Sequence, residues 1–252
     1  MGSMGGSRTL KRSAAPPIWP VERKSFKWVV KPSPGPHPQD QSVPVLLILR
    51  DMLGLVENTH EAKVVLNQGK FIVNGKIIKR IDFPVGIMDV VKIPDLDKTF
   101  RLLPYKNGFL LHEIGEEESK FRILRIENKT ILSKNLMQLN LSAGVNLAIK
   151  LTSPQDGKNV QYKTLDSLKV DVTGKQILDH IKLEIGKLVL VFKGKNSGAW
   201  GVLTEIVPAF KKRRSLVRIT LSNNRVVETI LDYVIVVGKD KPLISLPSMN
   251  GE

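Results

Sequence analysis

Hydrophobic positions follow a helical spacing mainly in one part of the chain. An apolar run that opens with Pro44 and closes before Gly54 predicts a short helix, because proline suits a first helical position and glycine a helix end. Asn58 then stands at an N-cap position with Glu61 three residues later, and the apolar residues that follow share one face. A second helix is therefore predicted, ending by Gly69.

The rest of the pattern is typical of β-strands. Asn74-Gly75 separates two β-rich runs, which predicts a hairpin because both residues tolerate a positive φ. Residues 105–185 contain few helical runs, and apolar and polar residues alternate most clearly at 167–172. From residue 186, glycines punctuate short apolar strands, which predicts tight turns with uncovered main-chain N–H groups.

The charge of the chain indicates what kind of partner it binds. The chain has 252 residues, and its 39 Lys and Arg against 24 Asp and Glu give a formal net charge of +15. Residues 1–43 carry +5 and residues 193–225 carry +7. This excess favours a polyanionic partner, either nucleic acid or an anionic membrane.

The N-terminal block is read as an extended arm. Eight of the fifteen prolines lie between Pro16 and Pro44, which excludes a continuous helix or a central strand there. Trp19, Phe26 and Trp28 stand among its basic residues, a composition suited to following phosphates while a ring stacks on an exposed base. A disordered tail, or an arm packed on its own domain, is the alternative.

Several function classes are disfavoured. No apolar run reaches the ~18 residues that span a bilayer, and no signal-peptide stretch begins the chain, so we expect an intracellular protein. The chain has no cysteine and its four histidines are scattered, so no metal site or other cofactor is expected. The glycine-rich segment 194–198 lacks the order of a phosphate-binding nucleotide loop, so no small-molecule substrate is expected.

Two modules can be matched to families. Gly54-Leu55, Ala62, the run 69–76 and Asp89 resemble the S4-like RNA-binding domain, a fold with two helices and a small curled sheet. The stretch 186–202 resembles the KOW motif of ribosomal and transcription-elongation proteins, which implies an SH3-like barrel that meets RNA through its loops.

The order of the modules resembles one family over nearly the whole chain. Four segments carry this resemblance: 10–16 in the arm, 44–50 in the first helix, 83–90, and the tail 238–247. They are similar to the archaeal and eukaryotic type of ribosomal small-subunit protein four, with an archaeal character. The resemblance implies a cytoplasmic, non-enzymatic constituent of the small ribosomal subunit whose partners are ribosomal RNA and neighbouring ribosomal proteins.

The expected fold is α+β and multidomain. We expect a basic Pro-rich arm at 1–42, an S4-like module at 43–104, a central, mostly β domain at 105–172, and a KOW barrel with a tail at 173–252. The expected RNA-binding residues are Arg8, Lys11 and Arg12 in the arm; Arg50, His60, Lys63, Asn67, Lys70 and Lys76 in the S4-like module; and Lys193, Lys195, Asn196, Lys211, Lys212, Arg213, Arg214 and Arg218 near the C-terminus.

Three alternatives remain. A non-ribosomal RNA-processing or transcription-elongation factor would use the same modules. An RNA-modifying enzyme would need a nucleotide-type βαβ unit, which the pattern does not predict. A membrane-surface protein would need a basic amphipathic helix, whereas the basic blocks here lie in the Pro-rich arm and a turn.

Overall fold

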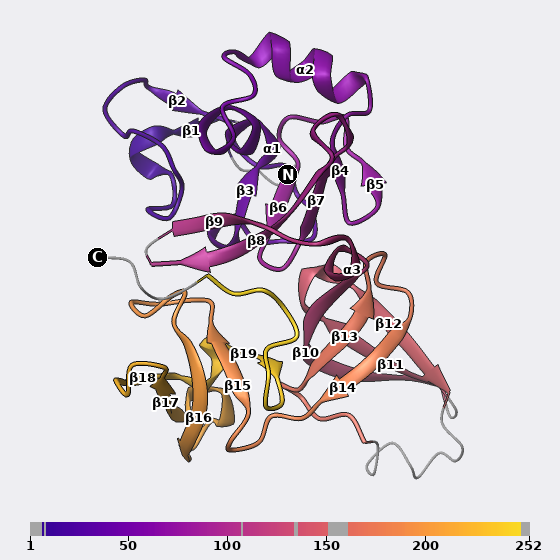
Figure 1. Cartoon of the computed structure of the whole chain (residues 1–252), viewed down its shortest axis with the longest axis vertical. Helices are drawn as coiled ribbons and strands as arrows, with labels where there is room; N and C mark the ends of the chain where they lie inside the picture. The colour runs from indigo at the N-terminus through magenta and orange to yellow at the C-terminus, as the bar shows by residue number, and fades with distance from the viewer. Residues whose placement is uncertain (1–6, 8, 107, 134–135, 151–160, 248–252) are drawn as a thin grey trace, which may run out of the picture.

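Three five-stranded antiparallel sheets make up most of the molecule, which is a mixed α/β fold dominated by strands. The computed structural model describes residues 7, 9–106, 108–133, 136–150 and 161–247. In Figure 1 the first sheet and the N-terminal arm form the upper part, and the other two sheets lie side by side below.

The first sheet has the strand order β5-β4-β7-β8-β9. Its strands are β4 (Ile72–Val73), β5 (Lys76–Ile77), β7 (Val90–Ile93), β8 (Lys98–Tyr105) and β9 (Gly108–Glu113). The predicted hairpin at Asn74-Gly75 is confirmed, and both residues have a positive φ. The expected module end at residue 104 falls within this sheet, because β9 pairs with β8 and extends the sheet to residue 113.

Helical segments precede this sheet. The predicted first helix appears as α1 (Val45–Leu47) followed by a π-helical stretch, Ile48–Met52, and all residues from 45 to 49 are buried. The second is α2 (Thr59–Asn67). As predicted, Asn58 is its N-cap: its side-chain oxygen accepts from the amides of His60 at 2.9 Å and Glu61 at 3.0 Å.

The N-terminal arm folds onto the same core rather than extending away from it. It contains the short pair β1 (Leu10–Lys11) and β2 (Trp28–Val29), and β3 (Ser42–Pro44) pairs with β6 (Pro84–Gly86). Ala15 and Trp19 are buried in the core formed by the helices and the first sheet. The Trp19 Nε1–H donates to the Ser42 carbonyl at 2.7 Å. The alternative of a packed arm is thus the observed one for the described residues.

The central sheet has the order β12-β11-β10-β13-β14. Its strands are β10 (Phe121–Ser133), β11 (Leu136–Leu141), β12 (Asn146–Lys150), β13 (Ser167–Asp171) and β14 (Ile177–Ile181), and α3 (Glu116–Ser119) precedes them. The expected boundary at residue 172 falls within this sheet, because Thr173 and Gly174 lie between the paired strands β13 and β14.

The C-terminal sheet has the order β18-β17-β16-β15-β19. Its strands are β15 (Leu188–Val191), β16 (Trp200–Val207), β17 (Leu216–Leu221), β18 (Val226–Ile230) and β19 (Val234–Gly238). Gly198, at the start of β16, has a φ of +88°, and a Cβ there would lie 2.8 Å from the main chain of Tyr105 and Lys106. Only glycine allows this close approach between the first and third sheets.

The three sheets also share buried side chains. One cluster joins Met88 and Leu103 of the upper part to Ile123 of β10 and to Leu190 and Ile235 of the C-terminal sheet. Because interiors are closely packed, this cluster fixes the relative position of the parts.

Candidate nucleic-acid interface

A buried carboxylate lies where the arm, the first sheet and the central sheet meet. Asp89 is 0% exposed, and its side chain accepts from Asn74 Nδ2 at 2.8 Å, from the Gly86 amide at 2.9 Å and from Arg122 Nη1 at 3.0 Å. Its Oδ2 also lies 2.8 Å from Nε2 of His37. Burial alone would raise the pKa of Asp89, but the interactions with His37, Arg122 and the Gly86 amide lower that pKa to about 2. Asp89 is therefore a fixed negative charge that binds three segments together.

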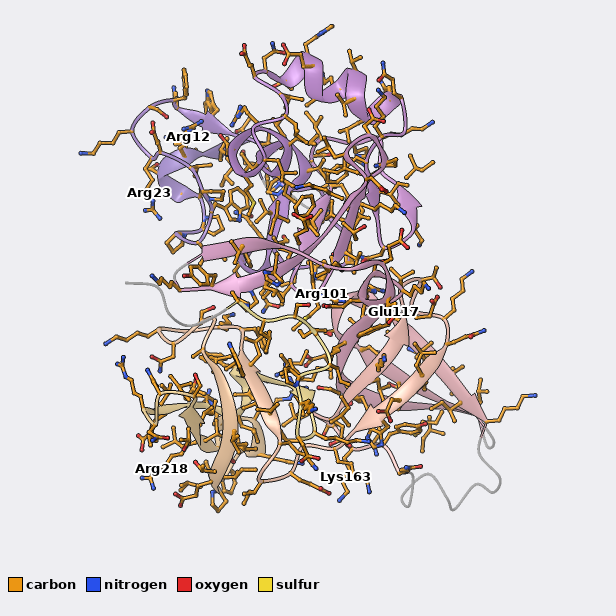
Figure 2. All side chains as sticks on the ribbon, in the orientation of Figure 1. Arg12, Arg23, Arg101, Glu117, Lys163 and Arg218 are labelled. Carbon is orange, nitrogen blue, oxygen red and sulfur yellow. The ribbon has the colours of Figure 1, made fainter. Side chains whose placement is uncertain are left out.

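Two further arginines are buried beside this junction. Arg101, on β8, has a fully buried side chain: its Nη2 donates to the Glu118 carbonyl at 2.9 Å and to the Phe121 carbonyl at 3.1 Å, and its Nε lies 3.2 Å from a Glu118 carboxylate oxygen. Burial lowers the pKa of Arg101 to about 10, against the opposing effect of Glu118. Figure 2 shows Arg101 in the middle of the molecule, between the upper and lower parts.

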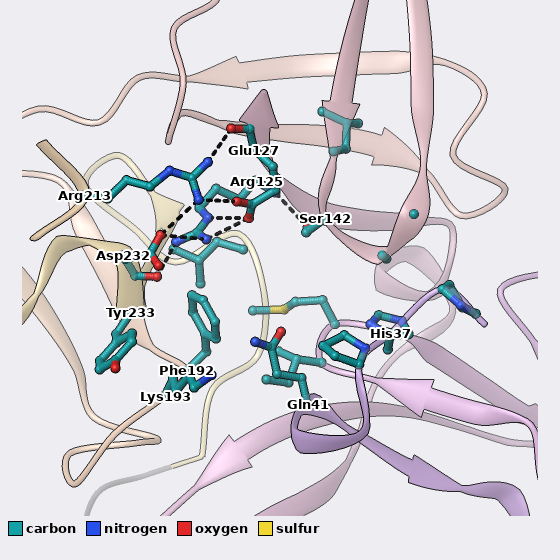
Figure 3. A pocket seen from close by; sticks show the side chains of 18 residues that line it. His37, Gln41, Arg125, Glu127, Ser142, Phe192, Lys193, Arg213, Asp232 and Tyr233 are labelled. Atoms are coloured by element: carbon teal, nitrogen blue, oxygen red, sulfur yellow. Dashed lines mark hydrogen bonds and ion pairs between the residues drawn. The ribbon is translucent and has the colours of Figure 1, made fainter. Parts of the chain in front are cut away.

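The third is Arg125 on β10, which joins the central and C-terminal sheets. Its Nη1 donates to the Asp232 carbonyl at 2.6 Å and to the Val234 carbonyl at 3.2 Å, while its Nε donates to Glu127 at 2.8 Å. Arg213 Nη1 lies 3.2 Å from Glu127 Oε2 and 3.3 Å from Asp232 Oδ1. Figure 3 shows these four charged side chains around one network.

A cavity of about 360 Å³ adjoins this network and is lined from the arm, the central sheet and the C-terminal sheet. His37 and Gln41 lie on one side of it and Phe192 and Asp232 on the other (Figure 3). The network pairs two arginines with two carboxylates, so its charges cancel at the cavity wall. The cavity is thus a junction between modules and not a concentrated positive site.

The predicted residues of the upper part are mostly accessible. His60, Lys63, Asn67 and Lys76 are exposed, and none of their side chains has an ion-pair partner among the described residues. The other two are held locally: Arg50 pairs with Asp51 at 3.0 Å, and Lys70 pairs with Asp95 at 2.7 Å.

The predicted residues of the C-terminal part also divide into accessible residues and residues with a partner. Lys195, Lys211, Lys212 and Arg214 are exposed and have no ion-pair partner in the described part of the chain. The remaining ones are engaged: Lys193 with Asp40 at 2.7 Å, Arg213 in the network above, Arg218 with Glu205 at 2.6 Å and Glu228 at 2.8 Å, and the Asn196 side chain with the Glu228 carbonyl at 3.1 Å.

The arm differs most from expectation. Arg8 lies outside the described residues, and Lys11 is exposed. Arg12 is only 7% exposed, and its guanidinium donates to the Glu22 carbonyl at 2.7 Å and to the Ser25 hydroxyl. This burial argues against a direct RNA contact by Arg12, because its donors are satisfied inside the arm. Of the arm's aromatics, Phe26 and Trp28 are exposed and Trp19 is not.

The accessible residues among those predicted therefore lie in three places: the arm, the upper part with α2 and the β4–β5 hairpin, and the turns of the C-terminal sheet. Four buried residues hold these places in fixed positions: Asp89, Arg101, Arg122 and Arg125. Sequence reasoning used Asp89 only as a motif match and missed the three arginines. A usable signal exists for the arginines, since they interrupt the apolar strands 99–104 and 121–126. A charge in such a strand requires a buried partner.

The histidines are consistent with satisfied or surface residues. His37 contacts Asp89, and His180 Nε2 lies 2.8 Å from Asp166 Oδ2. Among the described residues no group of three or more acidic or histidine side chains is placed to hold a metal ion. No helix in the described ranges is both long and apolar enough to cross a bilayer.

Comparison with known proteins identifies the class. Family models match three consecutive parts of the chain: the RS4NT (NUC023) domain at residues 4–40, the S4 domain at 48–91 and Ribosomal family S4e at 96–177. The order of these matches follows the order of the arm, the first sheet and the central sheet.

Relatives match over nearly the whole length. The small ribosomal subunit protein eS4 of Aeropyrum pernix is 42% identical over 248 residues, covering 98% of both chains, and that of Methanocaldococcus jannaschii is 38% identical over 250 residues, covering 98% of this chain and all of the relative. The crystal structure of the 30S ribosomal protein S4e from Thermoplasma acidophilum is similar with a TM-score of 0.64 at 25% identity, covering 79% of this chain and 96% of that one. The chain belongs to the ribosomal S4e family.

Proposed function

We propose that this protein is a structural constituent of the small ribosomal subunit, where it binds ribosomal RNA. The observation that carries this proposal is the 42% identity to a small ribosomal subunit protein over 98% of both chains. The net charge of +15 supports RNA as the partner, because Lys and Arg contacts to phosphates release condensed counterions.

The proposed RNA interface consists of the accessible predicted residues in the three places described above, which are basic side chains and one amide. Its members are Lys11 in the arm; His60, Lys63, Asn67 and Lys76 in the upper part; and Lys195, Lys211, Lys212 and Arg214 in the C-terminal part. Residues that pair at the surface, such as Lys70, Lys193 and Arg218, can exchange their carboxylate for a phosphate at little cost, since exposed ion pairs contribute little. Buried Arg12 is left out for the reason given above.

Rigid spacing gives this interface its selectivity. Phosphate contacts carry no sequence information, so a protein that recognises folded RNA by shape must hold its cations at fixed separations. The buried arginines and the shared apolar cluster supply that rigidity. A structural, non-catalytic role agrees with this arrangement, and the partners we propose are small-subunit ribosomal RNA and adjacent ribosomal proteins.

We also propose that the C-terminal sheet is a KOW-type, SH3-like barrel. Five short antiparallel strands around a common core support this, as do the glycine turns at residues 186, 194 and 198, all with positive φ. On the observed strand pairings, the proposed domains are the arm with the S4-like part up to residue 113, a central domain from 116 to 181, and the barrel from 186.

The experiment is sedimentation of a lysate of the native cells through sucrose gradients at low and high salt, with the protein located by mass spectrometry. We expect stoichiometric recovery with the small subunit, including after moderate salt. Recovery in the light fractions, or release at modest salt, would refute the structural role and favour a transient RNA-processing factor. Comigration with RNA polymerase would favour transcription elongation instead.

A further inference from the structure

The connection between β16 and β17 is braced along its length. The Ala209 amide donates to the Ser215 hydroxyl at 3.1 Å, and the Arg214 amide donates to the Lys211 carbonyl at 2.8 Å. Buried Ser215 also accepts from the Leu231 amide through its carbonyl at 2.8 Å. The loop from residue 208 to 215 is thus held by its own hydrogen bonds and by one from Leu231, at the start of the short 3-10 helix that follows β18.

Arg213 ties the same loop to the central sheet. Its Nη2 donates to the Glu127 carbonyl at 2.5 Å, and its Nη1 lies close to the Glu127 and Asp232 carboxylates (Figure 3). One of the four adjacent cations therefore faces the protein and fixes the loop. The other three, Lys211, Lys212 and Arg214, remain exposed.

At the start of this basic run is an aromatic ring with no cover. Phe210 is fully exposed, with a relative accessibility of 104%, whereas Phe71 in the upper core is completely buried. Two apolar residues at the base of the same loop are also partly exposed: Val207 and Leu216 pair across β16 and β17 and are 38% and 48% exposed. The braced loop therefore holds an aromatic side chain in water directly beside three accessible cations.

We propose that Phe210 stacks on an unpaired base of RNA while Lys211, Lys212 and Arg214 bind the adjoining phosphates. The inference rests on the proposed function and adds a base-contacting residue to it. An aromatic ring beside cations matches the alternation of π-face and phosphate in a single strand. The brace contributes as well, since a loop already held in shape loses little entropy on binding.

The charge around the ring favours RNA over a protein partner. A protein-binding apolar patch usually has a core depleted of charge, and lysine in particular is rare there. Here basic residues follow the ring directly in the chain, and the carboxylate of Glu228 on β18 is paired with Arg218. The surroundings thus attract a polyanion.

The test uses the full-length protein and two probes of equal charge: an unstructured RNA 12-mer of mixed sequence, and a 12-mer with abasic sites in place of its central bases. Phe210→Ala should weaken binding of the first probe about tenfold, Phe210→Leu by an intermediate amount and Phe210→Trp not at all. None of these variants should change binding of the abasic probe. Because the ring is fully exposed, each variant should keep the wild-type unfolding midpoint.

Salt dependence separates the ring from the cations. Phe210→Ala should leave the slope of log affinity against log salt unchanged, while Lys212→Gln, the matched control in the same loop, should reduce that slope by about 0.7. A local readout comes from Phe210→Trp, whose added emission should be quenched by the base-bearing probe only.

The outcomes are distinct. Equal weakening of both probes by Phe210→Ala, or of neither, would overturn the stacking role while leaving RNA binding by the protein intact. Normal RNA binding combined with poor incorporation of Phe210→Ala into small subunits would overturn it in favour of a protein contact. If the wild-type protein bound neither the 12-mer nor small-subunit ribosomal RNA, the proposed function itself would fail.

Discussion

Two sets of positive charge in this protein have opposite environments. Arg101, Arg122 and Arg125 lie in strands and are buried, with carboxylate or carbonyl partners at fixed distances. The loop cations 211–214 are exposed and adjacent to one another, and among them only the Arg213 side chain has ion-pair partners in the described part of the chain. Buried basic side chains therefore hold parts of the protein together, whereas the exposed ones in the loop remain accessible to a binding partner.

The difference follows from solvation. A buried guanidinium loses its hydration and is tolerated because carboxylate or carbonyl oxygens lie against it, so removing the arginine or its partner leaves an uncompensated charge. Exposed cations keep their hydration and interact weakly with one another through water, which leaves them free to exchange counterions for phosphate. Substitutions in the first set should change stability, and substitutions in the second should change RNA affinity.

The largest effect should come from Arg122→Met. This change removes the Arg122–Asp89 pair and leaves a carboxylate that is 0% exposed with one fewer charge partner. We expect the free energy of unfolding to fall by about 3–5 kcal/mol in denaturant titrations. Lys212→Met is the matched control on the exposed loop and should change it by less than about 0.5 kcal/mol. Similar values for the two variants would contradict the distinction drawn here.

The converse prediction concerns the triple variant Lys211→Gln, Lys212→Gln, Arg214→Gln. Losing three phosphate contacts should lower affinity for small-subunit ribosomal RNA about a hundredfold at about 0.1 M salt and reduce the salt slope by about 2. The free energy of unfolding should be unchanged or slightly higher, because like charges are removed. Filter binding across a salt series, together with denaturant titration, measures both. An unfolding loss above about 1 kcal/mol would mean that the loop cations also serve cohesion.

Acid should weaken the buried junction. The pKa of Asp89 is lowered from 3.8 to about 2 in the folded protein, so its ionised form contributes stability that is fully present above about pH 4. That contribution, about 2 kcal/mol, should be lost as the pH falls from about 4 to 2. Asp89→Asn should be less stable at neutral pH and should lose less on acidification across this window. An identical pH dependence in the two proteins would rule out the role given to Asp89.

The sequence predicted local features well. The Asn58 cap, the Asn74-Gly75 hairpin and the strand at 167–171 all depend on neighbours within a few residues, and each is present. Most of the expected interface residues are exposed, as is usual for Lys and Arg, and their contact with RNA stays a prediction.

Long-range features could not be found in this way. Arg125 donates to a carbonyl 107 residues away, and no local pattern indicates which carbonyl that is. Composition also misled in the arm, where Arg12 and Trp19 have the residue types of an RNA contact. Arg12 is buried and donates to the arm's own backbone, and Trp19 is buried in the upper core. The boundaries expected at 104 and 172 fall inside observed sheets, and a tight hairpin turn has the same residue types as a domain junction.

The smallest effect should come from Arg213→Gln, which tests the exposed end of the network that Arg125 anchors. The Arg213 side chain is 47% exposed, so water screens its attraction to Glu127 and Asp232, and the free energy of unfolding should fall by about 0.5 kcal/mol. In about 1 M salt, where the Debye length is about 3 Å, most of this difference should vanish. The Arg122→Met deficit should persist there, because its partner carboxylate lies out of reach of screening ions. If the loss in free energy of unfolding for Arg213→Gln persisted in salt, Arg213 would behave like the buried arginines. The loop would then contribute to holding the sheets together.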